Sequence, residues 1–70
     1  MSVYKIVELV GTSPTSWEDA ARTALVTASK SLEDLRIAEV VRQDVTVDNG
    51  TIIEFRVRLN ISFKYREGGA

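Results

Sequence analysis

The sequence predicts an α+β fold with the element order β-α-β-β, in which a three-stranded antiparallel sheet wraps around one long helix. Three observations predict it. Residues 53–65 alternate between apolar and polar, a tight-turn sequence precedes them at residues 48–50, and a stripe of apolar residues with helical spacing lies nearer the N-terminus. The 70 residues suit one domain, which we place at residues 1–67, followed by a flexible tail at residues 68–70.

The first strand is expected at residues 3–10, VYKIVELV, which are rich in β-branched side chains and contain no strand breaker. Val3, Val7 and Leu9 share one face of this strand, which is therefore the face that meets the core. Gly11 is expected to end the strand.

The helix is expected from about residue 14 to residue 33 or 34. Two starts fit the sequence: Ser13 as the N-cap with Pro14 in the first helical position, or Thr15 as the N-cap with Glu18 closing a capping box. About 20 residues at 1.5 Å each give a helix of roughly 30 Å, so the sheet must curl around it. The apolar stripe, with Trp17 expected in the core, consists of Trp17, Ala20, Ala21, Ala24, Leu25, Ala28 and Leu32.

The second and third strands are expected to form a hairpin. The second covers residues 36–47, and its alternation slips near residues 39–41, which indicates a β-bulge. Asp48-Asn49-Gly50 favours a tight turn. Because the helix returns the chain, the first strand can pair antiparallel with the third, which gives the sheet order 1-3-2. The third strand turns its odd residues to the core and leaves a bare polar face with Glu54, Arg56, Arg58, Asn60 and Lys64.

Composition excludes several classes of function. The chain has no Cys and no His, which removes Ser-His and Cys-His catalysis, and its ten carboxylates form no acid–base pair, so we expect no enzyme. A formal charge of −1 argues against a nucleic-acid partner. No apolar run approaches the roughly 20 residues that span a membrane, and no signal-peptide pattern begins the chain, so a cytoplasmic location is expected.

Small size favours self-association. A core of this size rarely stabilises a chain alone by more than about 3–5 kcal/mol, and this sequence has neither disulfides nor His or Cys metal ligands. The bare polar face carries charges of both signs, which suits contact with a second copy.

Taken in order, several segments resemble the dodecin family. They are Gly11-Thr12-Ser13 after the first strand, the helix start Ser16-Trp17-Glu18-Asp19-Ala20-Ala21, Ala38-Glu39-Val40, the turn Asp48-Asn49-Gly50 and a closing strand from Phe55 to Phe63. The resemblance covers residues 2–66. It implies the same β-α-β-β fold, a hollow homododecamer, and a non-enzymatic role in flavin binding and storage.

The residues that would bind flavin differ from the family pattern. The resemblance places Ile37 where flavin-binding dodecins have a stacking Trp, and Arg56 where they have a hydrogen-bonding Gln; Gln43 is taken as a third pocket equivalent. Losing an aromatic stack removes roughly 0.5–1.5 kcal/mol beyond burial, so typical flavin binding is not expected. The alternative is an altered flavin pocket, with Ile37 as an apolar wall and Arg56 against a phosphate or the ring carbonyls.

The chain resembles the calcium dodecin branch in residues 1–5, residues 11–18, Gln43-Asp44 and residues 62–64. That resemblance implies calcium as a ligand. Calcium needs 6–8 oxygens, so a site would have to be shared between copies, and the candidate ligands are Glu39, Asp44 and Asp48. A third hypothesis is a protein-interaction module whose bare sheet face binds a partner protein.

Overall fold

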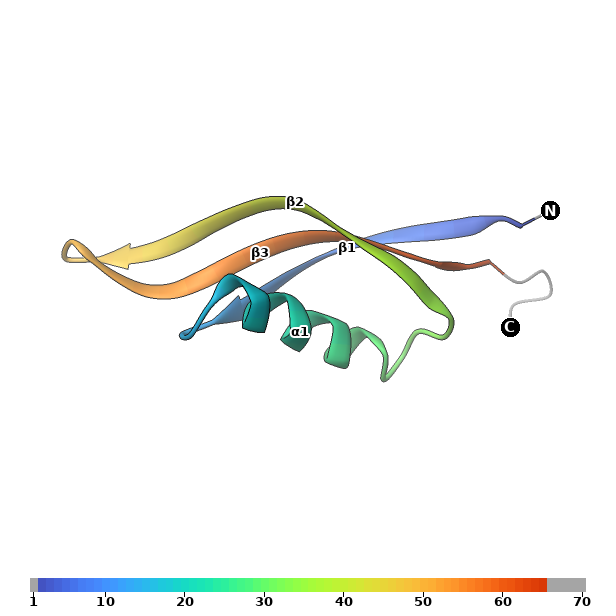
Figure 1. The fold of residues 1–70 in the computed structure, drawn as a ribbon, viewed down its shortest axis with the longest axis horizontal. Helices are drawn as coiled ribbons and strands as arrows, with labels where there is room; N and C mark the ends of the chain where they lie inside the picture. Colours follow the sequence, from blue (N-terminus) through green and yellow to red (C-terminus); the bar gives the residue numbers. More distant parts are fainter. Residues whose placement is uncertain (1, 66–70) are drawn as a thin grey trace.

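The computed structural model describes residues 2–65 and contains one sheet with the strand order β1-β3-β2 and one helix (Figure 1). The elements are β1 Tyr4–Ser13, α1 Trp17–Ala28, β2 Leu35–Asp48 and β3 Thr51–Lys64. Both strand pairs are antiparallel. The predicted β-α-β-β order and the sheet order 1-3-2 are thereby confirmed, whereas the tail expected at residues 68–70 lies outside the described residues.

The central strand β3 supplies most of the large core side chains. Val57, Leu59 and Ile61 are its fully buried residues, and they meet the helix residues Ala20 and Ala24. All three belong to the odd-numbered face, as predicted, whereas Ile53 and Tyr65, at the two ends of the predicted alternation, are each 52% exposed. On β1 the inward side chains are Val7 and Leu9, as predicted, which pack at the margin of this core. Val3, predicted on the same face, precedes the strand and is 65% exposed.

The helix begins later than either predicted start. Its N-cap is Ser16, whose Oγ accepts a hydrogen bond from the backbone N–H of Asp19 at 3.0 Å. Ser13 instead accepts from the N–H of Thr15 at 3.0 Å and donates to a carboxylate oxygen of Asp19 at 2.7 Å. The buried Ser13 hydroxyl thus ties the end of β1 to the first turn of α1.

The helix also ends earlier than predicted, after 12 residues. The Oγ of Ser29 donates to the carbonyl oxygen of Val26 at 2.8 Å, and the N–H groups of Lys30 and Ser31 donate to the carbonyls three residues before them, at 3.2 Å and 3.1 Å. Such bonds compete with helix propagation and close the last turn. Asp34, with a φ of 57°, then redirects the chain into β2. Leu32 still packs against the core from this connection.

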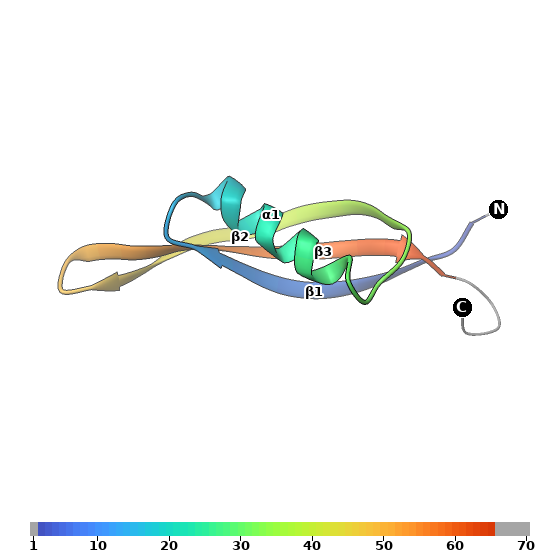
Figure 2. The ribbon, with the colours of Figure 1, turned by 90° about the horizontal axis from the view of Figure 1, so that it is seen from below.

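The short helix leaves the hairpin unsupported at one end. Twelve residues span about 18 Å at 1.5 Å each, whereas the molecule measures 50 × 20 × 15 Å. The helix packs chiefly on β1 and β3. Residues 45–54 form the far part of the hairpin, called here the arm, which extends beyond the helix in both views (Figures 1 and 2).

The hairpin has the local features that the sequence predicts. The register of β2 against β3 shifts between Val40 and Arg42, which places the bulge at Val41. Asn49 and Gly50 have φ values of 51° and 78°, as a two-residue hairpin turn requires. Trp17 is partly buried: its ring meets Phe55 edge-on at 5.2 Å, and its Nε1 donates to the carbonyl of Asp44 at 3.1 Å.

Gly11 does not end β1, which continues to Ser13. The glycine lies directly under the helix. A Cβ at this position would overlap the carbonyl oxygen of Ala20 and lie 2.9 Å from the Cβ of Ala24. The absence of a side chain at Gly11 therefore permits the close contact between α1 and β1.

We expect Gly11→Ala to lower the free energy of unfolding by about 1–3 kcal/mol, because the added methyl group forces the helix away from the sheet. Urea unfolding followed by tryptophan fluorescence measures this change. Thr12→Ala, at the neighbouring exposed position, is the matched control and should change stability by less than about 0.5 kcal/mol. Equal stability of Gly11→Ala and the wild type would contradict the close contact.

Candidate functional site

The sheet face opposite α1 is uncovered within residues 2–65 (Figure 1). Because cross-strand partners share a face, the register identifies its residues. We call it the open face. It consists of Tyr4, Ile6, Glu8, Val10 and Thr12 on β1, Ile37, Glu39, Arg42, Asp44 and Thr46 on β2, and Glu54, Arg56, Arg58, Asn60, Ser62 and Lys64 on β3. Apolar and charged side chains of both signs are thus mixed on one surface.

Asp44 and Arg56 form an ion pair on the open face, near its hairpin end. They are cross-strand partners, and Nε and Nη2 of Arg56 donate to the two carboxylate oxygens of Asp44 at 2.8 Å and 3.3 Å. The hydrogen bond from Arg56 holds the pKa of Asp44 below its ordinary value, against a smaller opposing effect of desolvation. The same bond raises the pKa of Arg56. The ion pair therefore uses both carboxylate oxygens of Asp44 and two N–H donors of Arg56.

The neighbouring charges are arranged more loosely. Nη1 of Arg58 lies 3.5 Å from a carboxylate oxygen of Glu8 on β1. Arg42 is the cross-strand partner of Arg58, so two like charges face each other, and both guanidinium groups help to lower the pKa of Asp44. The open face therefore carries a mixture of charges of both signs and is not a single basic or acidic patch.

One chain does not bring the three candidate flavin-pocket residues together. Ile37 is opposite Ser62, six residues along β3 from Arg56, which corresponds to about 20 Å at 3.3 Å per residue. Gln43 is opposite Val57 and faces the helix side of the sheet. Ile37 and Arg56 do share the open face, and Ile37 is 68% exposed.

The bulge at Val41 explains why Gln43 lies on the other face. One extra residue reverses the alternation of side chains along a strand. Ile37 and Glu39 precede the bulge and lie on the open face, and after it Asp44 takes that face while Gln43 leaves it.

The three candidate calcium ligands are also far apart within one chain. In the register of the hairpin, Glu39 is opposite Asn60, Asp44 is opposite Arg56, and Asp48 is opposite Thr51. The nine residues from Glu39 to Asp48 span roughly 30 Å. Among residues 2–65, no group of three His, Cys, Asp or Glu side chains could hold a metal ion. A calcium site that uses these carboxylates therefore needs a second copy of the chain.

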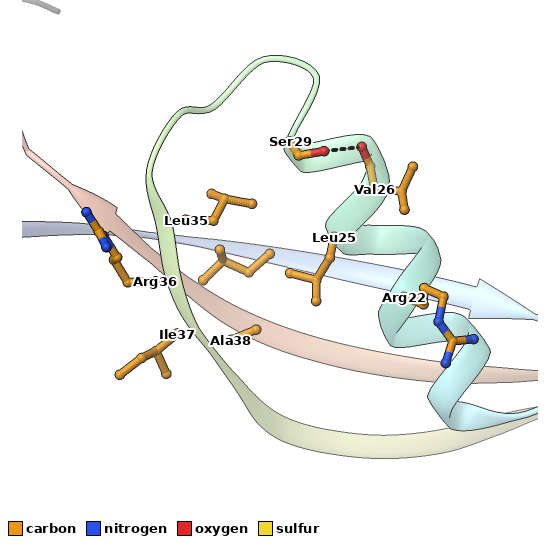
Figure 3. Close-up of a pocket in the computed structure, with 9 residues that line it drawn as sticks. Arg22, Leu25, Val26, Ser29, Leu35, Arg36, Ile37 and Ala38 are labelled. Carbon is orange, nitrogen blue, oxygen red and sulfur yellow. Dashed lines mark hydrogen bonds between the residues drawn. The ribbon is translucent and has the colours of Figure 1, made fainter.

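A cavity that sequence reasoning missed lies between the second half of α1 and the start of β2. It has a volume of about 360 Å³. Leu25 and Ala38 point toward each other across it, Leu35 lies at one side, and Arg22 and Arg36 lie at its two ends (Figure 3). We call it the α1–β2 groove; it is lined by Arg22, Leu25, Val26, Ser29, Leu35, Arg36, Ile37, Ala38 and Ile61. It exists because α1 stops at Ala28 and packs chiefly on the other two strands.

The fold and the open face define a small α+β protein with more apolar surface than its one helix covers. The chain belongs to the dodecin family, since the family model described as Dodecin matches residues 3–66. No helix within residues 2–65 is long and apolar enough to cross a membrane.

Individual relatives are similar along nearly their whole length. Calcium dodecin from Mycobacterium tuberculosis is 50% identical over 66 residues, which are 94% of this chain and 93% of that protein. Dodecin from Thermus thermophilus is 40% identical over 65 residues, which are 93% and 94% of the two chains. The sequence resemblance to dodecins, and to the calcium dodecin branch in particular, is therefore confirmed.

Solved structures show the same fold. The structure of dodecin from Streptomyces coelicolor has a TM-score of 0.91 at 31% identity and covers 96% of each chain. A crystal structure of calcium dodecin from Mycobacterium tuberculosis, described as having a novel calcium-binding site, has a TM-score of 0.84 at 46% identity and covers 99% of each chain.

The Asp44–Arg56 pair predicts a pH-dependent contribution to stability. Because the folded pKa of Asp44 lies below its ordinary value of 3.8, this contribution is present at neutral pH and is lost as the pH falls through the folded pKa. We expect the wild type to be more stable than Arg56→Gln at pH 7, and the difference to shrink below about pH 4. Urea unfolding of both proteins between pH 2 and 7 measures it.

Arg58→Gln is the matched control, because the contact of Arg58 with Glu8 is longer, at 3.5 Å. Its stability difference from the wild type should depend less on pH. A wild-type advantage over Arg56→Gln that stays constant down to pH 2 would contradict the role of the Asp44 charge.

Proposed function

We propose that the chain is a non-enzymatic binding or storage protein that assembles as a hollow homododecamer. The observation that carries this proposal is the match to dodecins along nearly the whole chain. Exposed apolar surface supports it. Among residues 2–65, about half or more of each of twelve large apolar side chains is accessible in the single chain, which favours burial against further copies. The exposed side chains are Val3, Tyr4, Ile6, Val10, Val26, Ile37, Val40, Val41, Val47, Ile52, Ile53 and Tyr65.

The absence of catalysis is part of the proposal. The sequence contains neither His nor Cys, and the one strongly coupled charged pair on the open face, Asp44 with Arg56, is neutralised internally. A carboxylate held by a guanidinium group is a poor general base, because its pKa is lowered. The cytoplasmic location expected from the sequence stays a prediction, as does the absence of nucleic-acid and membrane partners.

Calcium is the ligand we propose first. The relative that is 50% identical carries the name calcium dodecin, which supports the same ligand class here. Glu39, Asp44 and Asp48 remain the candidate ligands, in sites shared between copies. Of these, Asp44 would have to release Arg56 before it could bind a cation.

Flavin binding in an altered pocket is the second candidate. The exposure of Ile37 on the open face favours it, because an apolar wall there is accessible to a planar ring. The Asp44–Arg56 pair opposes it, because the pair uses the guanidinium donors that a flavin would need. A protein-interaction module is the third hypothesis, and it differs from the others in requiring no assembly of copies.

The molecular mass in solution tests the proposed assembly. We expect light scattering at micromolar concentration to give about twelve times the chain mass of 7.8 kDa, because copies bury the exposed apolar surface. A well-folded single chain that melts cooperatively under the same conditions would contradict the assembly and favour the interaction module.

Calcium should raise the melting temperature, because a ligand that binds only the folded protein stabilises it. We expect a chelator to lower the melting temperature by several degrees, and added calcium to restore it. Glu39→Gln and Asp48→Asn should reduce this shift, whereas Glu33→Gln, an exposed position outside the candidate ligands, should leave it unchanged. An identical melting temperature with and without calcium would remove cation binding from the proposal.

Riboflavin fluorescence distinguishes a protein without typical flavin binding from one that binds flavin in an altered pocket. We expect the wild type not to quench riboflavin at nanomolar concentration, because Ile37 offers no aromatic stack and Arg56 is paired. The double variant Ile37→Trp/Arg56→Gln should bind more tightly. Nanomolar quenching by the wild type, with little change in the double variant, would favour the altered pocket instead.

A further inference from the structure

We infer that the arm of one copy, residues 45–54, docks in the α1–β2 groove of a second copy. This inference rests on the proposed self-association and names the surfaces that make one of its contacts. The groove is then a site that a single chain leaves incomplete.

The arm lacks support within its own chain. The first strand ends at Ser13, which pairs with Phe55, so residues 51–54 of β3 pair with β2 alone. A two-stranded ribbon is marginally stable in water unless something packs on it. Val47, Ile52 and Ile53 are 57%, 52% and 52% exposed on this ribbon. Docking would bury them.

The groove offers a matching apolar surface. Ala38 and the buried Ile61 line the groove from the sheet, Leu25 lines it from the helix, and the exposed Val26 lies at its margin; Figure 3 shows Leu25 and Ala38 facing each other. Its volume of about 360 Å³ falls in the range of binding cavities in proteins. It is also open to solvent along β2, because α1 packs chiefly on β1 and β3.

The charges on the two surfaces are complementary. The charged residues that line the groove are Arg22 and Arg36, which are both basic. The charged residues of the arm are Asp48 and Glu54, which are both acidic. The groove pairs of Arg22 with Asp19 and of Arg36 with Asp34 are long, at 3.7 Å and 4.0 Å. The open face carries charges of both signs, so it does not attract the acidic arm as the basic groove does.

The arm cannot reach the groove of its own chain. Ala38 in the groove and Asp48 at the tip belong to the same strand, ten residues apart, which corresponds to about 33 Å. The start of β2, which lines the groove, and the turn between β2 and β3 lie toward opposite ends of the molecule (Figure 1). Docking is therefore intermolecular. Each copy has one arm and one groove, so the contact repeats head to tail from copy to copy and closes into a ring.

Engineered cysteines test the contact, because the chain has none of its own. In the double variant Val26→Cys/Ile53→Cys, a short bismaleimide should link the arm of one copy to the groove of the next. We expect covalent species of two, three and more chains on a denaturing gel. Either single variant can give at most two linked chains.

The matched control is Val26→Cys/Val10→Cys, because Val10 is exposed to a similar extent as Ile53, at 48% against 52%, but lies on the open face. It should give no species longer than two chains. Arm variants that stop at two chains, or a control that forms equally long species, would overturn the docking. If light scattering shows that the wild type is assembled, failure of the docking test leaves the proposed function intact. A monomeric wild type contradicts the proposed function itself.

A second measurement does not depend on linker geometry. Ile53→Asp should raise the concentration at which the assembly dissociates by roughly tenfold or more, because it would place an unpaired carboxylate in an apolar groove. Ile53→Val keeps the apolar contact and should dissociate near the wild-type concentration. Equal dissociation of Ile53→Asp and the wild type would overturn the docking.

Discussion

A short helix on a long sheet is the constraint on which the rest of this structure depends. The helix has 12 residues and covers about 18 Å, whereas β3 has 14 residues and extends for about 46 Å. The helix therefore buries only the middle of β3, at Val57, Leu59 and Ile61. One whole face of the sheet, the end of the hairpin and the groove beside β2 stay uncovered. A small domain with so few buried side chains has little stability to spare, and burial of these surfaces in an assembly would supply more.

The sequence was sufficient for the topology because its two strongest patterns decide it. The alternation in β3 defines the central strand, and the Asn49-Gly50 turn fixes its pairing with β2. The predicted start of the helix was wrong because several neighbouring hydroxyl side chains could cap it. Ser13 lost that role through a tertiary contact, the hydrogen bond of its hydroxyl to Asp19, which no local pattern reveals. Likewise, the crossing point of the helix over Gly11 depends on packing and not on strand-breaking propensity.

The candidate site was less predictable, because a bulge changes which residues meet. The sequence indicated the bulge near Val41 but not its effect on the face of each later residue. That reversal brings Asp44 opposite Arg56 and turns Gln43 to the helix side. The α1–β2 groove depends in turn on where the helix ends, so it could not be predicted from a helix that was expected to continue to residue 33 or 34. The wrong prediction of where α1 ends therefore prevented prediction of the α1–β2 groove.

The Asp44–Arg56 pair bears on both candidate ligands in the same way. It uses carboxylate oxygens that calcium would need and guanidinium donors that a flavin would need. The remaining groups lie toward the two ends of β2, with Ile37 and Glu39 toward its start and Asp48 at the hairpin turn. Calcium requires 6–8 oxygens, which neither end holds alone. A ligand that uses these groups would therefore sit where copies meet, and the proposed assembly would have to form before the ligand binds.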